Sequence, residues 1–364
     1  MRLREGSIVK MRSGNQVRVI RASDRDVELG RDGDGYLYLV EDMTTEKRFA
    51  LKWCNEHFFD YLPKDDTGRP ATIAFHENLC GLCNKGLPNV CFSFPIDVTQ
   101  TIEGKFYGYT MPLRENRFVG LTSILYSGES FDNLKALCHA CENIAYASCI
   151  LHRHGFSYPG MSLEDIFIDL KTGDISVWCY DNLAYLNDEN TTGIKGSYTL
   201  MAPELLSRKA KPSLGSDYHQ LAVILFYLTM RGHPLEGARW CRFPVVNHEF
   251  YDMIYGDGAV FVYDTNDTSN RPLRGIHDNV IALWSFYPEY IRNLFTKAFS
   301  HRALTCSADE AALIRVRDWQ WKTAFADLRN LVIPCSHCKK QVYLDKDNPQ
   351  IVCKHCGKQI LSAY

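Results

Sequence analysis

The strongest constraint in the sequence is a pair of Cys-x-x-Cys motifs near its C-terminal end, "CSHC" and "CKHC", separated by fourteen residues. Two such pairs on hairpin turns can surround a tetrahedral Zn²⁺ ion with four thiolates. The intervening "KKQVYLDKDNPQIV" alternates like two strands around a turn. A unit this small cannot bury a core of its own without such a crosslink. We therefore predict a zinc ribbon over residues 331–364, with structural zinc held by Cys335, Cys338, Cys353 and Cys356.

The chain has fourteen cysteines in all. Because the N-terminal "MRLREGSIVK" is polar and strand-like, we expect no secretory leader, reduced thiols and a cytoplasmic protein. Two more Cys-x-x-Cys pairs, Cys80 with Cys83 and Cys138 with Cys141, lie in segments with helical periodicity. At this spacing each pair shares one helical face, so two such helices could hold a second metal. We favour the other interpretation, in which buried cysteine behaves as a small hydrophobic residue.

The composition is that of an ordinary globular protein, with 46% hydrophobic and 23% charged residues among 364. This length suits a large two-lobed domain with a small appendage. No stretch approaches the roughly 18 uninterrupted apolar residues of a spanning helix, so we expect no membrane segment. The net charge of −2, with only "KKQVY" interleaving basic and aromatic residues, argues against a nucleic-acid partner.

A glycine-rich hairpin is predicted near the N-terminus, where "VELGRDGDGYLYLVEDMTTEKRFALKW" reads as three strands joined by two turns. Such a loop lets backbone amides approach a phosphate, and a lysine on the next strand can pair with it. Because β-turns use glycine for many reasons, the hairpin alone is weak evidence for nucleotide binding. The candidate cofactor-binding residues are Gly30, Gly33, Gly35, Lys52 and, as the partner of this lysine on a helical pattern, Glu77.

Several recognisable segments follow one another along the rest of the chain. "YGYTMPL" is strand-like, "FDNLKALCHACENIAYASCILHRHG" predicts a long amphipathic helix, and "SYPGMSLEDIFID" predicts a loop that leads into a short apolar strand. "GSYTLMAPELL" comes next, followed by "SDYHQLAVILFYLTMRGHPLEG", in which Asp217 opens an apolar helix. In "RVRDWQWKTAF", Trp319 and Trp321 are two residues apart, so on a helix they cannot share one face.

In this order and spacing, the segments resemble the protein-kinase superfamily over roughly residues 15 to 330. The chain looks most like bacterial kinase-like proteins that carry a C-terminal zinc ribbon and are encoded beside a von Willebrand A-domain protein and a metal-dependent phosphatase. That similarity extends to "FHENL", "GYTMPL", "MAPELL", "LAVILFYL", "GHPLEG" and "SNRP". The resemblance implies an α+β, bilobal kinase-like fold, with a β-rich N-lobe over 1–115 and a helical C-lobe over 116–330. It also implies a buried salt bridge for Glu204, and we expect Asp217 to cap loop amides.

The chain departs from this family in the catalytic loop. In "YPGMSLED", Tyr158 matches the aromatic residue that comes two positions before the catalytic aspartate, but Gly160 stands in place of that base and Asp165 in place of the metal-binding asparagine. A glycine can neither accept nor orient the proton of a substrate hydroxyl. Pro159 also replaces the arginine with which many kinases bind a phosphorylated activation loop, so we expect no control by loop phosphorylation.

The metal and phosphate positions are altered as well. Aligning "DNLA" places Cys179 where the family has its Mg²⁺-binding aspartate and Asp181 at a later acidic position, whereas a second register sets "DNL" in place of "DFG". We favour the first register, in which a continuing strand would let Asp181 partly substitute. Asp32 replaces the middle glycine of the phosphate loop and Asp34 its aromatic tip, so two carboxylates would repel a triphosphate. We expect weak or absent ATP binding and leave Mg²⁺ open.

These losses together predict a pseudokinase, which is a regulatory or scaffold protein in a bacterial phospho-signalling system, with no residue assigned as catalytic. By resemblance, its partners would be a von Willebrand A-domain protein, a metal-dependent protein phosphatase or an active kinase. The alternative is an enzyme with a rearranged kinase cleft, either an atypical ATP-dependent phosphotransferase or a nucleotidyltransferase. In that case Asp165, Asp181 and Glu164 could supply metal ligands.

Overall fold

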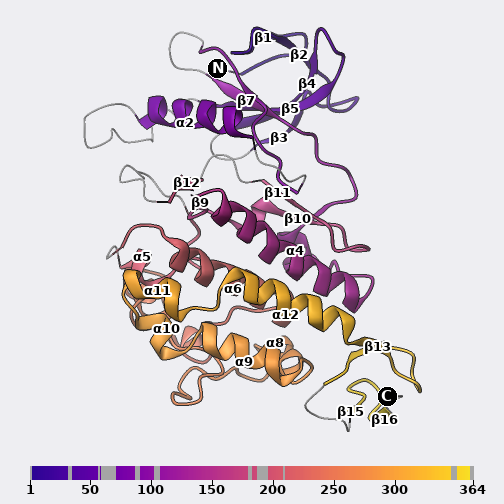
Figure 1. Cartoon of the computed structure of the whole chain (residues 1–364), viewed down its shortest axis with the longest axis vertical. Helices are drawn as coiled ribbons and strands as arrows, with labels where there is room; N and C mark the ends of the chain where they lie inside the picture. Colours follow the sequence, from indigo (N-terminus) through magenta and orange to yellow (C-terminus); the bar gives the residue numbers. More distant parts are fainter. Residues whose placement is uncertain are drawn as a thin grey trace. The chain divides into compact units, whose positions relative to one another are not determined.

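The chain divides into two compact units. A computed structural model describes residues 2–31, 35–55, 58, 71–86, 91–101, 107–178, 183–186, 196–207, 210–345 and 351–360. The first unit comprises Met1–Asn116 and a short return that begins at Ser176, and the second comprises Arg117–Ile175, Leu183–Asp188 and the chain from Lys195 to Tyr364. Figure 1 labels most of the elements of both. Within the described ranges, no helix is long and apolar enough to span a bilayer.

An antiparallel sheet forms the body of the first unit, with strand order β1-β2-β4-β5-β7-β6 and with β3 paired to β4. The elements of this unit are β1 (Ile8–Lys10), β2 (Gln16–Ile20), β3 (Glu28–Arg31), β4 (Gly35–Asp42), β5 (Arg48–Cys54), α2 (Ala71–Lys85), β6 (Asp97–Val98) and β7 (Gly108–Met111). The turn between β4 and β5 closes because the Asp42 carboxylate accepts hydrogen bonds from the backbone N–H groups of Thr44 and Thr45, at 3.0 and 2.7 Å. The three predicted strands of the glycine-rich segment are thus present as β3, β4 and β5.

Both faces of β5 are buried, and they face different clusters of apolar side chains. Leu51 and Trp53 pack with residues of β1, β2 and β4, whereas Ala50 and Cys54 pack with residues of α2, β6 and β7. Because successive side chains of a strand point to opposite faces, Lys52 lies on the same face as Ala50 and Cys54. Its side chain is buried there, on the α2 side of the strand.

Helices dominate the second unit, and α6 (Leu214–Met230) forms its centre with nearly every residue buried. Two long helices, α4 (Leu134–Arg153) and α12 (Asp318–Asn330), pack along each other, and α4 also contacts α6. The other helices are α3 (Leu121–Tyr126), α5 (Pro203–Leu206), α7 (His248–Ile254), α8 (Asp278–Trp284), α9 (Glu289–Ala298), α10 (His301–Thr305), α11 (Ala308–Ile314) and the 3-10 turns η1 (Leu163–Asp165) and η2 (Trp240–Arg242).

Short strands complete the second unit. They are β8 (Val119–Gly120), β9 (Phe156–Ser157), β10 (Ile166–Ile168) and β12 (Ala184–Tyr185), and β11 (Ile175–Val177) lies where the chain returns to the first unit. The C-terminal ribbon contains two hairpins, β13 (Val332–Pro334) with β14 (Gln341–Tyr343) and β15 (Ile351–Val352) with β16 (Gln359–Ile360). The predicted α+β architecture is therefore confirmed, with a β-rich N-terminal unit, a helical unit and a ribbon at the C-terminal end.

The long helix predicted from periodicity and the helix that carries the two tryptophans each bury one face. In α4 this face includes Cys138, Cys141 and Ile144. In α12, Trp321 is fully buried and its ring lies 6.1 Å from that of Phe325, while Trp319 is 54% exposed. The prediction that the two tryptophans lie on different faces is confirmed.

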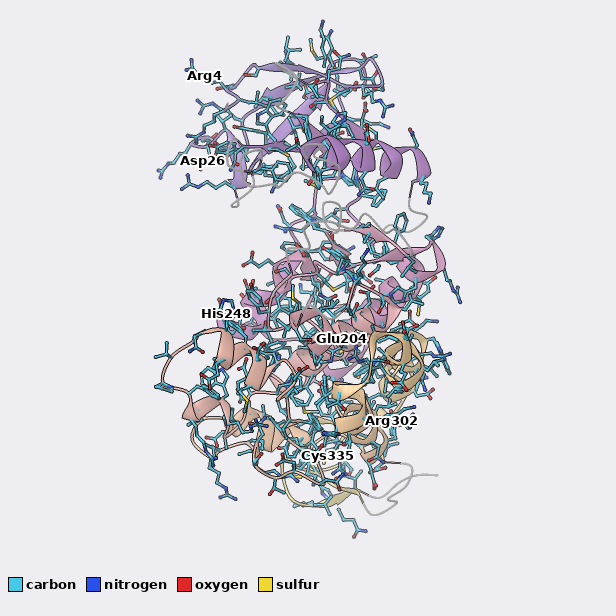
Figure 2. All side chains as sticks on the ribbon, turned by 90° about the vertical axis from the view of Figure 1, so that its left-hand side faces the viewer. Arg4, Asp26, Glu204, His248, Arg302 and Cys335 are labelled. Carbon is cyan, nitrogen blue, oxygen red and sulfur yellow. The ribbon has the colours of Figure 1, made fainter. Side chains whose placement is uncertain are left out.

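A buried ion pair joins segments that are far apart in the sequence of the helical unit. Both carboxylate oxygens of Glu204 accept hydrogen bonds from Arg315, each at 2.7 Å, and the arginine side chain is only 1% exposed. The Arg315 Nε–H group also donates to the Ala303 carbonyl at 3.1 Å. Figure 2 shows Glu204 among the helices of this unit. The salt bridge that the resemblance implied for Glu204 is present, and it links α5 to the end of α11.

We expect Glu204→Ala to lower the free energy of unfolding by about 3–5 kcal/mol, because it leaves a buried guanidinium without its counter-charge. Urea denaturation of the full chain measures this effect. The matched control is Glu129→Ala, which removes an exposed carboxylate and should stay within about 0.5 kcal/mol of the wild type. Equal stabilities of the two variants would contradict the importance of this ion pair.

Candidate metal centre and candidate catalytic loop

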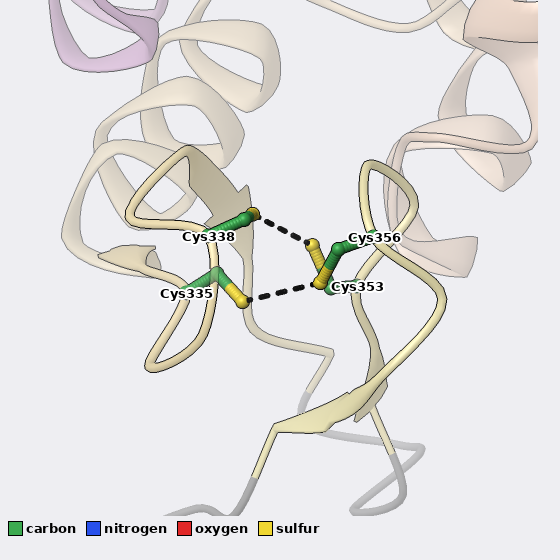
Figure 3. Close-up of side chains that lie close together, drawn as sticks. All are labelled: Cys335, Cys338, Cys353 and Cys356. Carbon is green, nitrogen blue, oxygen red and sulfur yellow. Dashed lines mark hydrogen bonds between the residues drawn. The ribbon is translucent and has the colours of Figure 1, made fainter.

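Four cysteine sulfurs converge in the C-terminal ribbon (Figure 3). The sulfur of Cys335 lies 3.8 Å from that of Cys356, the sulfur of Cys338 lies 3.7 Å from that of Cys353, and all four lie within 4.8 Å of one another. In a tetrahedral site with Zn–S bonds of about 2.3 Å, the sulfurs are roughly 3.8 Å apart. The four thiols therefore form a cluster suited to a metal ion such as Zn²⁺.

Two equivalent turns present these sulfurs. The backbone N–H groups of Cys335 and Cys353 donate across their turns at 2.8 and 2.9 Å, and the fourth residue after each is left-handed, with φ of 62° at Lys339 and 69° at Gly357. Hydrogen bonds from backbone N–H groups, foremost that of Cys338, lower the pKa of the Cys335 thiol to about 6. This lowered pKa favours the thiolate, the form that binds a metal, at Cys335, whereas the pKa of the neighbouring Cys338 thiol is raised to about 11.

The ribbon is packed against the helical unit through its strand β14. The ring of Tyr343 stacks on that of Tyr287 at 5.2 Å, and its hydroxyl lies 3.6 Å from the sulfur of Cys138 in α4. The side-chain oxygen of Gln341 accepts a hydrogen bond from the backbone N–H of Leu134 at 2.6 Å. This N–H belongs to the first turn of α4, where backbone donors have no partner within the helix. The ribbon thus satisfies a donor of the long helix as well as covering part of its apolar face.

Neither of the other two Cys-x-x-Cys pairs belongs to a metal-type cluster among the described residues of its own unit. Within the part of the chain that the structure describes, the ribbon cysteines are the only group of three or more His, Cys, Asp or Glu side chains placed to hold an ion. Burial raises the pKa of Cys83 and of Cys138 to about 12, so both thiols are neutral. Cys80 belongs to the apolar cluster between α2 and the sheet. The interpretation of these cysteines as small hydrophobic residues is supported.

The predicted catalytic loop runs from β9 through η1 to β10 and is held by two carboxylates. Asp217, near the start of α6, accepts hydrogen bonds from the backbone N–H of Tyr158 and the hydroxyl of Ser157, both at 2.9 Å. Asp165 accepts hydrogen bonds from the backbone N–H of Ser162 at 2.8 Å and from the Tyr158 hydroxyl at 2.9 Å. The expectation that Asp217 caps loop amides is confirmed, and Asp165 closes the loop on itself.

Gly160 lies in a buried turn of this loop. It supplies no side chain at the position where the kinase pattern has its base. One oxygen of Asp165, Oδ2, accepts both of the hydrogen bonds described above. The neighbouring Glu164 is exposed. What the described part of the loop offers is therefore a hydrogen-bonded scaffold, and a metal-binding role for Asp165 and Glu164 stays a prediction.

Sequence reasoning did not single out His152, which lies between two buried carboxylates. Its Nδ1 is 2.7 Å from Oδ2 of Asp318 at the start of α12, and its Nε2 is 3.1 Å from Oδ2 of Asp217. The side chains of all three residues are less than 10% exposed. Burial alone would lower the pKa of His152, but the hydrogen bonds to Asp217 and Asp318 outweigh it and raise this pKa to about 9. His152 is therefore a cation at neutral pH, joining α4, α6 and α12.

In the first unit, each candidate residue that the structure describes lies on one of the strands or on the helix named above. Gly30 is in β3 beside a register shift, and Gly35 opens β4 opposite Cys54. A Cβ atom at Gly35 would lie 2.3 Å from the carbonyl oxygen of Trp53, so the sheet itself requires glycine there. Lys52 is buried on β5, and Glu77 is exposed on α2. An ion pair between Lys52 and Glu77 stays a prediction.

The remaining candidates belong to segments that the structure does not describe. Gly33, with its neighbours Asp32 and Asp34, lies outside the described residues, as do Cys179 and Asp181. Comparison with known proteins adds no assignment, since no protein-family model and no curated protein matches the chain.

We expect the purified protein to contain zinc in equimolar amount, and we expect Cys353→Ser to lower both its zinc content and its melting temperature. A structural zinc site contributes its binding free energy to folding, so loss of a ligand destabilises the ribbon and the face of α4 that it covers. Inductively coupled plasma mass spectrometry and a thermal melt measure the two effects, with Cys306→Ser as the control outside the cluster. A zinc-free protein whose melting temperature is insensitive to chelators and to Cys353→Ser would contradict this assignment.

We expect the stabilisation by His152 to depend on pH. Because the pKa is about 9 in the folded chain and about 6.5 in an unfolded one, the contribution is complete below pH ~6.5 and is lost as pH rises towards 9. At about 1.4 kcal/mol per unit of pKa, it amounts to roughly 3 kcal/mol.

Urea denaturation between pH 6 and 9.5 tests this expectation by comparing the wild type with His152→Gln. The difference in unfolding free energy between the two should be largest near pH 6 and should shrink towards pH 9.5. His154→Gln, which alters an exposed histidine two residues further along, serves as the control and should show no such trend. A pH-independent difference for His152→Gln would show that this histidine is neutral in the folded protein.

Proposed function

We propose that the chain is a pseudokinase: a regulatory or scaffold protein in a bacterial phospho-signalling system, with weak or absent ATP binding. The proposal rests on the resemblance of its sequence segments to the protein-kinase superfamily. The observation that carries it is Gly160, a buried glycine at the position of the catalytic base, in a loop whose other anchors are retained. The α+β architecture with a C-terminal four-cysteine cluster is compatible with the proposal.

The loop supports this function because it keeps the hydrogen bonds that hold its backbone and lacks a side chain at residue 160. Asp217, Tyr158 and Asp165 hold its backbone by hydrogen bonds, as a positioned catalytic loop requires. No side chain at residue 160 can accept the proton of an attacking hydroxyl, and general-base help of this kind contributes about 10²- to 10⁴-fold to a rate. A loop maintained by buried polar contacts without its base is better suited to preserving a shape than to transferring phosphate.

The proposal of weak nucleotide binding draws on the residue types of the phosphate loop and on two described residues of the first unit. The sequence puts Asp32 and Asp34 in the proposed phosphate loop, and each carboxylate beside a triphosphate would cost about 1 kcal/mol or more unless a cation intervenes. The kinase pattern would assign Gly35 to phosphate binding. The close approach of this residue to the Trp53 carbonyl already explains why it is a glycine. Lys52 is the one candidate residue that keeps the burial and strand position expected of a phosphate-binding lysine.

A scaffold of this kind would act through protein partners. The resemblance points to a von Willebrand A-domain protein, a metal-dependent phosphatase or an active kinase, and the exposed Trp319 on α12 is one apolar side chain available for contact. The alternative function, an atypical phosphotransferase or nucleotidyltransferase, draws on Lys52 and on metal ligands among Asp165, Asp181 and Glu164.

We expect at most a small thermal shift with ATP, with or without Mg²⁺, and we expect Lys52→Met to abolish whatever shift is seen. A ligand that binds only the native state raises its stability as its concentration exceeds the dissociation constant, so the titration reports binding directly. Lys47→Met, which alters an exposed lysine between β4 and β5, is the matched control.

Intact-mass analysis after incubation with ATP and Mg²⁺ or Mn²⁺ separates the alternatives. No added mass on the chain or on a candidate partner is the expected result. Addition of phosphate, abolished by Lys52→Met, would refute the pseudokinase proposal in favour of a phosphotransferase. Addition of AMP would identify a nucleotidyltransferase.

A further inference from the structure

The second unit contains a cavity of about 870 Å³ where the ribbon meets the helices, and neither the metal site nor the loop uses it. Its apolar lining comes from the start of α4, the end of α6 and the end of α8, and includes Leu134, Leu137, Leu228, Leu283 and Phe286. The volume lies within the roughly 300–1,000 Å³ of ligand pockets in proteins. It is large enough to take more than one apolar side chain of a ligand.

The ribbon supplies positive charge to the edge of this cavity. Lys340 lies two residues after Cys338, Lys354 lies directly after Cys353, and both are exposed lining residues. No carboxylate of a described residue lies within salt-bridge distance of either ammonium group. Arg231, at the left-handed end of α6, adds a third cation, and its guanidinium also donates to the Ile124 carbonyl.

The cations outnumber the acidic groups at this site. Asp132 is the one carboxylate among the described lining residues, against Arg231, Lys340 and Lys354, while the whole chain has a net charge of −2. A local excess of positive charge above an apolar floor is complementary to a ligand that carries carboxylates next to large apolar groups.

We propose that this cavity binds an acidic segment of a protein partner, with one or two large apolar side chains of the segment in the floor and its carboxylates against Lys340 and Lys354. The proposal deepens the partner-binding role and rests on it for its biological context. A buried apolar centre with a polar rim is the usual anatomy of a protein interface. Nucleic acid is disfavoured, because the edge offers few cations and no row of aromatic side chains.

The position of the two lysines makes the site dependent on the metal centre. Both are carried by the turns that present the zinc ligands, so their spacing relative to the apolar floor is defined only when the ribbon is folded. The Gln341 contact to the start of α4 holds the ribbon against that floor. Removal of zinc should therefore abolish peptide binding.

The test uses fluorescence anisotropy with the full zinc-loaded chain and a fluorescein-labelled peptide in which Asp and Glu alternate with Leu and Phe. Two peptides of equal length are compared with it: one with Lys in place of the acids and one with Ser in place of Leu and Phe. We expect both to bind at least roughly tenfold more weakly, since one loses the charge complementarity and the other the apolar anchor.

The double variant with Lys340→Glu and Lys354→Glu should weaken binding of the acidic peptide by at least roughly tenfold. Lys297→Glu, an exposed lysine of α9 outside the cavity, should leave the affinity unchanged. Zinc content and the thermal melt of each variant establish that the ribbon is still folded. If the double variant loses zinc, Lys354→Gln and Lys340→Gln are measured singly and are expected to weaken binding in the folded chain.

Three results would overturn the proposal. One is no binding of the acidic peptide at concentrations up to about 100 μM, because even weak recognition would give a dissociation constant of that size. Another is an equal effect of Lys297→Glu and the lysine pair. The third is binding of dodecanoate or a single-stranded oligonucleotide in place of the peptide, which would assign the cavity to another class of ligand. Phosphate transfer by the chain would refute the pseudokinase proposal and leave this measurement standing.

Discussion

The organisation of the helical unit depends on the contacts that the buried carboxylate of Asp217 makes. It lies in the first turn of α6, caps the backbone at Tyr158 and contacts His152 at the end of α4. His152 carries the connection on to Asp318 at the start of α12. One carboxylate, one cation and a second carboxylate thereby join three helices and a loop. Buried charges are tolerated only when each is paired and hydrogen-bonded, and this arrangement meets that condition.

The ribbon with the four-cysteine cluster plays a similar part at the N-terminal end of α4. Strand β14 carries Gln341 and Tyr343 to the N-terminal part of α4, where the Gln341 side-chain oxygen accepts a hydrogen bond from the Leu134 N–H and the Tyr343 hydroxyl lies beside the Cys138 sulfur. α4 is therefore held near its C-terminal end by the ion pairs of His152 and near its N-terminal end by the four-cysteine ribbon. The ribbon is thus part of the helical unit, and its lysines complete a cavity that the helices alone would leave open at one edge.

The candidate catalytic loop separates two properties that an active kinase combines. Hydrogen bonds from Asp217 and Asp165 specify the loop conformation, whereas the chemistry would depend on a side chain at residue 160. The sequence predicted the capping role of Asp217, which the structure confirms, and the proposed loss of a base at residue 160 rests on the resemblance of this short motif to a kinase loop. It assigned Asp165 to a possible metal site, and only the structure shows that this carboxylate closes its own loop through Tyr158 and Ser162.

Local patterns in the sequence determined the ribbon cysteines, the α4 helix and the opposite faces of Trp319 and Trp321. Each of these depends on spacings of a few residues or on one short segment, where covalent geometry limits the choices. The sequence did not determine the pairing of His152 with Asp318, which are 166 residues apart, or that of Gln341 with Leu134, which are 207 apart. Nor did it show that Gly35 is needed against the Trp53 carbonyl, or that two exposed lysines border an apolar cavity. Those contacts arise only when packing brings distant segments together, and for that reason the tertiary structure decided them.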